Sequence, residues 1–188
     1  IFGGNAPSRL FLNSGAGFFE EFNPSGFQLP GQDIFNGNPG LWAEGTFQHG
    51  TTSVDGTQCD IADTPLGVEI GDLDGDWDID ILQGARNEVP RIFKNRLVEA
   101  GALVSFRDVT HDAQSELASG GGNYEQELGD MDNDSDLDIY GLNWSGLSDI
   151  VSANDGTNHF GAFTVLANSS ADDNEGDFFD YDNDGDLD

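Results

Sequence analysis

Three nine-residue stretches carry an aspartate at every odd position, and this spacing has a clear chemical meaning. The stretches are residues 72–80, 130–138 and 180–188, named here loop 1, loop 2 and loop 3, with positions 1 to 9 counted along each. Five carboxylates so close together repel one another, so each loop needs a positive charge among them. All-oxygen donors at short spacing suit a hard cation, Ca²⁺ before Mg²⁺. We therefore expect about three calcium sites, with these metal-binding candidates: Asp72, Asp74, Asp76, Asp78, Asp80, Asp130, Asp132, Asp134, Asp136, Asp138, Asp180, Asp182, Asp184, Asp186 and Asp188.

The place of the last acid distinguishes these loops from an EF-hand. An EF-hand closes the shell of its ion with an acidic residue at position 12, where loops 1 and 2 have Gln83 and Gly141. The closing acid is expected at position 9 instead. From position 8 to position 10 of loops 1 and 2, apolar and acidic residues alternate, which predicts that a β-strand follows. We therefore expect the loops in β-hairpins and not between helices.

A run of aspartates can also be a solvated or disordered acidic tract, as most charged runs are. Such a tract has no reason to keep aspartate rather than glutamate at each odd position. Nor does it explain an apolar residue at position 8 of every copy. Metal coordination accounts for both regularities.

The charge of the chain limits its partners. Its 36 acidic and 6 basic residues give a net charge of −30. Nucleic acids and anionic membranes are bound by clustered lysine and arginine, so neither is expected as a partner, and a secreted, extracellular or cell-surface location fits better. No apolar run approaches the ~20 residues needed to cross a bilayer, so membrane insertion is not expected. Cys59 is the only cysteine, so no intrachain disulfide can form. Any cross-linking of the chain would have to come from bound metal.

Outside the loops, 26 glycines and short apolar alternations predict a mostly β fold with little helix. Residues 8–19 have the pattern strand, turn, strand, and residues 90–95 with 106–110 form a related pair. We interpret both as outer hairpins. Residues 31–67 lose the pattern and are interpreted as an insertion, either a binding surface or irregular packing. The loops recur at intervals of 58 and 50 residues, which favours stacked units of several short strands, such as β-propeller blades.

The chain resembles the FG-GAP repeat family, which includes the calcium-bearing VCBS repeats of bacterial surface proteins and the blades of the integrin α-subunit propeller. The resemblance rests on the three loops, on Gly71 and Gly129 before the first two, and on residues 9–13 and 106–110. It covers most of the chain outside residues 31–67.

The resemblance implies an all-β, propeller-type fold in which each loop joins the first two strands of a blade. It also implies that calcium is bound by the side chains at positions 1, 3, 5 and 9 and by the main-chain carbonyl at position 7, in Asp78, Asp136 and Asp186. The implied layout is an incomplete propeller: 1–30 outer hairpin of a leading blade, 31–67 insertion, 68–119 repeat 1, 120–170 repeat 2, and 171–188 start of repeat 3.

Some residues depart from the family pattern. Position 6, commonly glycine because the turn favours positive φ, is Trp77 in loop 1 and Ser135 in loop 2. A bulky residue in a left-handed conformation is costly, so we expect loop 1 to be re-routed or weaker. The outer hairpin of repeat 2, around residues 159–166, is degenerate, and that of repeat 3 is not recovered. An acid three residues before each loop is either an additional ligand or a solvent-facing strand residue: Glu69, Glu127 and Asp177.

The leading functional hypothesis is a secreted, non-catalytic, calcium-stabilised module for cell adhesion or for building an extracellular surface structure. Its partners would be other protein subunits or further blades, and possibly glycans. The alternative is the scaffold portion of a polysaccharide lyase or hydrolase, which resemblance in fold does not exclude. A calcium buffer or sensor is disfavoured because helix pairs that open on binding are not expected. No nucleophile motif accompanies His49, His111 or His159.

Three asparagines fit the glycosylation acceptor pattern. We expect sugar on Asn143 and Asn168 in preference to Asn133, because Asn133 lies in a tight loop beside an ion.

The number of loops bears on completeness. Propellers close with four to eight blades, whereas this chain has three loops, the last ending at Asp188. We expect a fragment of a longer polypeptide, or a neighbouring subunit that supplies the missing strands by β-augmentation.

Overall fold

The computed structural model is built of β-strands joined by turns, and describes residues 6–7, 10–22, 43–45, 58–59, 62–63, 65–85, 90–100, 106–110, 125–144, 146–171 and 175–188. The strands are β1 (Ala6–Pro7), β2 (Phe11–Asn13), β3 (Phe19–Glu21), β4 (Ala43–Gly45), β5 (Gln58–Cys59), β6 (Ala62–Asp63), β7 (Pro65–Gly71), β8 (Asp80–Ala85), β9 (Arg91–Asn95), β10 (Phe106–Asp108), β11 (Glu125–Gly129), β12 (Asp138–Leu142), β13 (Ile150–Ser152) and β14 (Thr164–Val165). Within these residues the one helix is α1 (Leu97–Ala100). The prediction of a mostly β protein is confirmed.

Two antiparallel meanders share one strand order. Strands β7, β8, β9 and β10 pair successively, and so do β11, β12, β13 and β14. Loop 1 joins β7 to β8, and loop 2 joins β11 to β12. The residue before position 1 pairs with position 9 in both hairpins, as Gly71 with Asp80 and Gly129 with Asp138. The prediction that loops 1 and 2 lie in hairpins is therefore confirmed.

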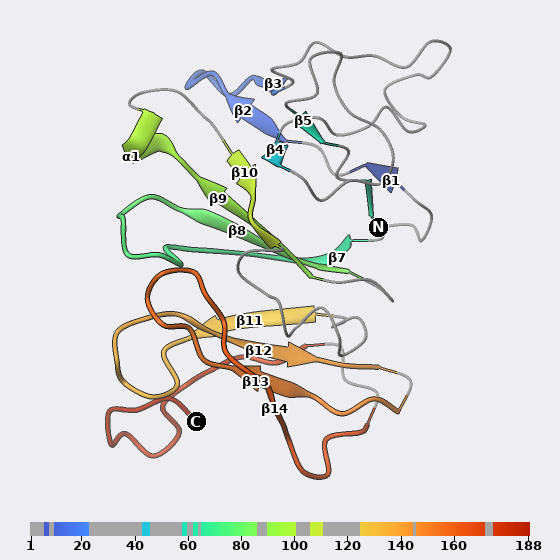
Figure 1. Ribbon diagram of the computed structural model, residues 1–188, viewed down its shortest axis with the longest axis vertical. Helices are drawn as coiled ribbons and strands as arrows, with labels where there is room; N and C mark the ends of the chain where they lie inside the picture. The colour runs from blue at the N-terminus through green and yellow to red at the C-terminus, as the bar shows by residue number, and fades with distance from the viewer. Residues whose placement is uncertain are drawn as a thin grey trace.

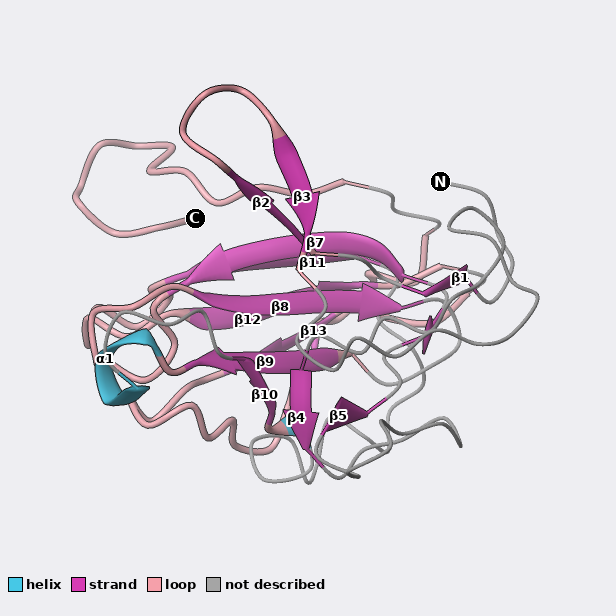
Figure 2. Ribbon diagram, turned by 90° about the horizontal axis from the view of Figure 1, so that it is seen from above, coloured by secondary structure: helices cyan, strands magenta, loops and turns pink. Residues whose placement is uncertain are grey.

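The two meanders stack face to face, with β11 packed against β7 and β8 (Figure 1). Seen from above, β7 lies over β11 and β8 over β12 (Figure 2). The buried apolar side chains between them form one core, which the hydrophobic effect stabilises: Leu73, Leu82, Ile92, Ile139, Ile150 and Phe160. As a result the three loops lie along the same edge of the stack, at the left of Figure 1.

Close packing of successive units requires glycine just before loops 1 and 2. A Cβ on Gly71 would lie 2.5 Å from Leu137 Cδ1 and 3.2 Å from Leu128 Cδ1, and a Cβ on Gly129 would lie 2.5 Å from Phe178 Cδ2. Leu128 and Phe178 are each two residues before position 1 of their own loops. The segment before loop 3 thus packs on the second meander as the second packs on the first.

The remaining strands extend or flank the first meander. β4 pairs with β10 in parallel and β5 pairs with β4, so part of the expected insertion, residues 31–67, widens the first sheet to six strands. Most other residues of that segment lie outside the described residues. β1 pairs with β6. None of the described residues forms a helix with the length and apolarity that a membrane span requires.

The predicted outer hairpins are present. β2 pairs with β3, and β9 with β10, as the sequence patterns predict. The hairpin of repeat 2 expected to be degenerate is formed by β13 and β14, and is short, with two residue pairs. His49 and His111 lie outside the described residues.

Candidate metal centres

All three loops are held in one conformation by hydrogen bonds from their own backbone. In loop 1 the carboxylate at position 1, Asp72, accepts from the amides of Asp76 at 3.2 Å and Trp77 at 3.0 Å. The carboxylates of Asp130 and Asp180 accept the equivalent pairs of bonds at 3.0–3.1 Å. The carboxylate at position 5 accepts from the amide at position 7 in every loop, at 3.0, 3.0 and 3.3 Å.

The carboxylate at position 9 closes each loop. One of its oxygens accepts from the amide at position 2, at 3.0 Å in loop 1 and 2.8 Å in loops 2 and 3. Asp80 and Asp138 are fully buried, at 0% exposure, whereas Asp188 is exposed. The geometry of the loop is thus repeated while its surroundings change.

Positions 4 and 6 are left-handed in every loop. Position 4 has φ of 62 to 72°, in Gly75, Asn133 and Asn183, and position 6 has φ of 73° in Trp77, 78° in Ser135 and 100° in Gly185. The expectation that loop 1 is re-routed is therefore wrong. The Trp77 side chain is 92% exposed, so its bulk meets solvent and only the local backbone cost remains. Gly or Asn at every position 4 is a signal for this conformation that the sequence analysis missed.

The carboxylates at positions 1, 3 and 9 come together in each loop. One oxygen from each lies within 4.8 Å of the others, in groups that could hold a metal ion. Asp76 and Asp78 form a separate group with Glu99 on α1. Among the described residues, the carboxylates at positions 5 and 7 of loops 2 and 3 belong to no such group. Of the ligands implied by the family resemblance, the structure therefore gathers positions 1, 3 and 9.

The donors of loop 1 suit a hard cation. Asp74 Oδ1 is buried and has no hydrogen-bond partner, and a buried carboxylate oxygen without a partner is costly. Calcium takes six to eight oxygen ligands, carboxylates prominent among them. An ion among positions 1, 3 and 9 would satisfy this oxygen, so the residues fit calcium.

Two asparagines that the sequence analysis did not single out support loops 1 and 2. The amide of Asn95 donates to Asp80 at 2.7 Å, and that of Asn154 donates to Asp138 at 2.8 Å. Their Nδ2 atoms donate to the carbonyls at position 8 of the two loops, both at 3.1 Å. Each asparagine lies 15 or 16 residues after position 9, and this recurrence is the signal that was missed.

The two loops also meet directly. The carbonyl of Leu73, at position 2 of loop 1, accepts from Asn154 Nδ2 at 2.8 Å and from the amide of Asn158 at 3.1 Å. Asn154 therefore binds backbone of both loops, and the turn after β13 caps loop 1.

Burial disfavours the charged forms of the closing acids. It raises the pKa of Asp80 to about 7, with repulsion from Asp74 and Asp78 acting in the same direction and two backbone amides opposing it. Burial also raises the pKa of Asp138. A bound cation favours the ionised form of a neighbouring carboxyl, so calcium would relieve this cost.

The acids three residues before each loop face one another. Burial raises the pKa of Glu127 to about 7, with repulsion from Glu69, Asp177, Glu125 and Glu175 adding to the effect. In the part of the chain that the structure describes, none of these acids joins a metal group. They form an acidic line across three successive units.

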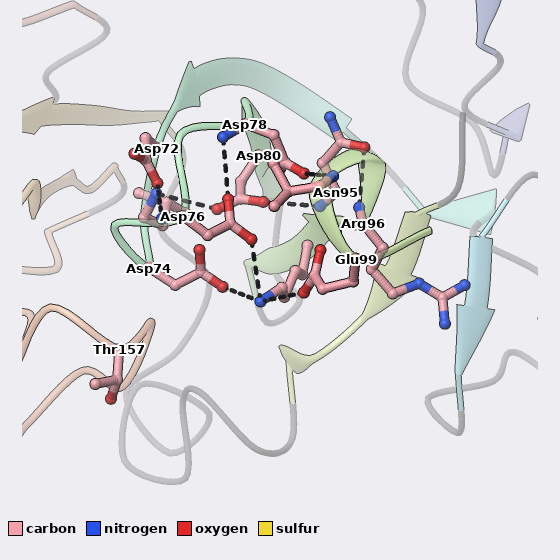
Figure 3. Close-up of polar contacts among 12 residues, drawn as sticks. Asp72, Asp74, Asp76, Asp78, Asp80, Asn95, Arg96, Glu99 and Thr157 are labelled. Carbon is pink, nitrogen blue, oxygen red and sulfur yellow. Dashed lines mark hydrogen bonds and ion pairs between the residues drawn. The ribbon is translucent and has the colours of Figure 1, made fainter. Parts of the chain in front are cut away.

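Among the described residues, loop 1 is the only one of the three loops in contact with a lysine and a helix; Figure 3 shows its aspartates beside Glu99 of that helix. The Nζ of Lys94, on β9, forms ion pairs with Asp74, with Asp76 at 3.4 Å and with Glu99 at 2.9 Å. Asp78, 4% exposed, accepts from the amide of Val98 at 3.0 Å and thereby holds α1 against the loop. Lys94 is the only lysine in the sequence, a signal not used in the sequence analysis.

The surroundings of Asn143 weigh against the expected glycan at this residue. Asn143 is 3% exposed, and its Nδ2, the atom that would carry sugar, donates to the carbonyl of Ser148 at 2.8 Å. Asn168 is exposed, as is Asn133, so burial does not separate these two.

Comparison of the chain with protein-family models, with curated proteins and with solved structures gives no match in any of the three. Function is therefore inferred from the residues and their geometry.

Proposed function

We propose that the chain is a calcium-stabilised, FG-GAP-type segment of a β-propeller, located outside the cell and used for adhesion or for assembly of a surface structure. The observation that supports this most is the repetition of one site. Three loops along one edge share the same grouping of carboxylates, the same internal hydrogen bonds and the same pair of left-handed residues.

Calcium would stabilise the hairpin that contains each loop. Each loop connects the first two strands of its unit, so an ion held by positions 1, 3 and 9 fixes the end of that hairpin. In loop 1, Leu73 lies between two of these acids and is buried in the core shared by both meanders, at 1% exposure. Fixing the loop therefore also fixes the surface on which the next unit docks.

The propeller assignment is supported by the stacking of units. Four-stranded antiparallel sheets arranged side by side are the blades of propellers. Two such meanders stack here, and Phe178 begins the same contact for a third. Val68 and Ile70 of β7 are exposed. Exposed apolar residues on a strand mark an interaction surface. The partners we propose for this surface are further blades or another subunit, with glycans as a further ligand class.

The proposed location rests on the proposed metal. Extracellular calcium modules work with dissociation constants of about 10⁻⁴–10⁻³ M. A chain with net charge −30 would gain most from divalent ions where they are abundant.

Calcium removal tests the proposal. Ligand binding to the folded state adds about 2.7 kcal/mol per site at a hundredfold excess over Kd, so calcium should raise the Tm strongly and a chelator should reverse the shift. Calorimetric titration gives the number of sites, and magnesium at equal concentration is the control ion. An unchanged melting curve in excess chelator would refute calcium stabilisation.

The role in assembly has its own test. Sedimentation with and without calcium should show calcium-dependent association of the purified chain with itself or with added surface glycans. A calcium-stabilised chain that remains monomeric and binds no glycan would contradict the adhesive role. The alternative, the scaffold portion of a polysaccharide lyase or hydrolase, would then be favoured.

A further inference from the structure

The positively charged side chain of Lys94 lies beside loop 1 and supports a second inference, which rests on the proposed calcium binding. The ammonium group of Lys94 contacts the carboxylates at positions 3 and 5 of loop 1, Asp74 and Asp76, and is held from the other side by Glu99. Figure 3 shows the carboxylates of Asp74, Asp76 and Glu99 directed toward one point.

The shared residue is Asp74, whose two oxygens have different partners. Its Oδ2 is paired with Lys94, whereas its Oδ1 is buried without a hydrogen-bond partner and belongs to the carboxylate that joins Asp72 and Asp80 in a metal group. A metal ion bound through Asp74 would therefore lie one carboxylate away from a fixed positive charge. Two positive charges so close repel each other strongly in a partly buried site.

Among the described residues, loop 2 has the same framework without this charge. Asn95 and Asn154 make equivalent bonds to positions 8 and 9 of their loops, so the residue before each occupies an equivalent place. That residue is Lys94 beside loop 1 and the exposed Ala153 beside loop 2.

We propose that Lys94 is a built-in competitor of calcium that lowers the affinity of loop 1, so that this loop responds to calcium over a higher concentration range than it otherwise would. The lysine neutralises the loop when calcium is scarce. The ion must then overcome this neutralised state before it fills the site.

Loop 1 contains its own spectroscopic probe. Trp77 is at position 6, while loop 2 has no aromatic residue and the aromatic residue of loop 3 is Tyr181. Terbium replaces calcium at oxygen sites and emits when a neighbouring tryptophan is excited. Excitation that tyrosine does not absorb therefore reports on loop 1, and Trp77→Phe should abolish the signal.

The main experiment titrates terbium into the purified chain, the Lys94→Gln variant and the charge-preserving Lys94→Arg variant, followed by displacement with calcium. Lys94→Gln should lower the apparent Kd of loop 1 by about tenfold, because one positive charge beside the ion is removed. Lys94→Arg should stay within about twofold of the original chain. Equal Kd values for all three, or equal tightening in both variants, would overturn the proposal.

Placing a lysine beside loop 2 provides an independent test if Lys94→Gln fails to fold. Exchanging the probe with Trp77→Ser and Ser135→Trp moves the emission to loop 2, and adding Ala153→Lys should then weaken terbium binding about tenfold. An unchanged Kd there would contradict the proposal. Calcium calorimetry on the original chain separates failure of calcium binding from failure of the role of Lys94. Absence of binding heat refutes calcium binding as a whole. Binding heat in the original chain, with Kd values unchanged in the Lys94 variants, refutes only the role of Lys94.

Discussion

Loops 1 and 2 have the same internal geometry in different surroundings. Both use positions 1, 5 and 9 to accept the same backbone amides, and both bring the acids at positions 1, 3 and 9 together. Loop 1 is enclosed by α1, by Lys94 and by the turn after β13, whereas residues 132–135 of loop 2 are exposed. The difference indicates that the nine residues encode the shape of the site, while their neighbours set its charge and its stability.

Position 9 should show the largest effect. In calcium-saturated protein, Asp80→Ala or Asp138→Ala should cost about 3 kcal/mol, because each removes a metal ligand and leaves two amide donors unpaired. Asp188→Ala also removes a metal ligand, but it should cost about 1 kcal/mol less than the other two, since that residue is exposed and accepts one amide bond. Urea unfolding measures all three. Equal losses would show that burial of position 9 is irrelevant.

Substitution of the two supporting asparagines, Asn95 and Asn154, should cause the next largest loss in the free energy of unfolding. Asn154→Ala removes bonds to two carbonyls, one in each loop, and should cost about 2 kcal/mol. Asn95→Ala removes the bond to the carbonyl of Ile79 and the bond accepted from the amide of Arg96, both at less buried places, and should cost about 1 kcal/mol or less. The same unfolding assay applies, and a larger loss for Asn95→Ala would reverse the assignment of Asn154 as the link between the loops.

The acidic line should give a pH-dependent effect. The pKa of Glu127 is raised from 4.5 to about 7 in the folded chain, so the folded state favours the protonated acid. This group therefore lowers the free energy of unfolding progressively as pH rises from about 4.5 to about 7, and the full penalty remains above that range. Glu127→Gln should stabilise the chain by about 1 kcal/mol at pH 8, after allowance for solvent screening, and have little effect at pH 4.

Melting curves at both pH values measure this difference. Glu20→Gln, at an exposed residue of β3, is the control and should change neither curve. A stabilisation by Glu127→Gln that is as large at pH 4 as at pH 8 would exclude charge repulsion as its cause.

The left-handed residue at position 6 should give the smallest effect. Trp77→Gly should stabilise the chain by about 0.5–1 kcal/mol, because glycine tolerates φ of 73° and the exposed ring contributes little packing. Gly75→Ala, at φ of 72°, is the matched opposite and should destabilise by a similar amount. Destabilisation by Trp77→Gly would mean that the ring packs on a partner.

The parts of the fold that follow from the sequence are local. Strand, loop and strand around loop 1 are encoded by aspartate spacing and by alternation with a period of two, and neighbouring residues form them. The parallel pairing of β4 with β10 was not predicted, because it joins segments more than sixty residues apart. No periodic pattern specifies such a contact.

The same limit applies to the site. Asn154 reaches Leu73 across 81 residues, and Lys94 reaches Asp74 only because β9 lies beside β8. Asn143 matches a glycosylation pattern that depends on three residues, whereas its burial is a property of the folded second meander. Chemistry carried by one loop was predictable, and chemistry shared between elements was not.

The cap on loop 1 has a consequence for the order in which the molecule is made. Asn154 and Asn158 donate to Leu73, so the first loop lacks its cap until the ribosome has released a segment synthesised much later. The first meander can pair its strands early, but its loop must wait for the second meander to arrive. The cap on loop 1 can therefore form only after the second meander has been synthesised.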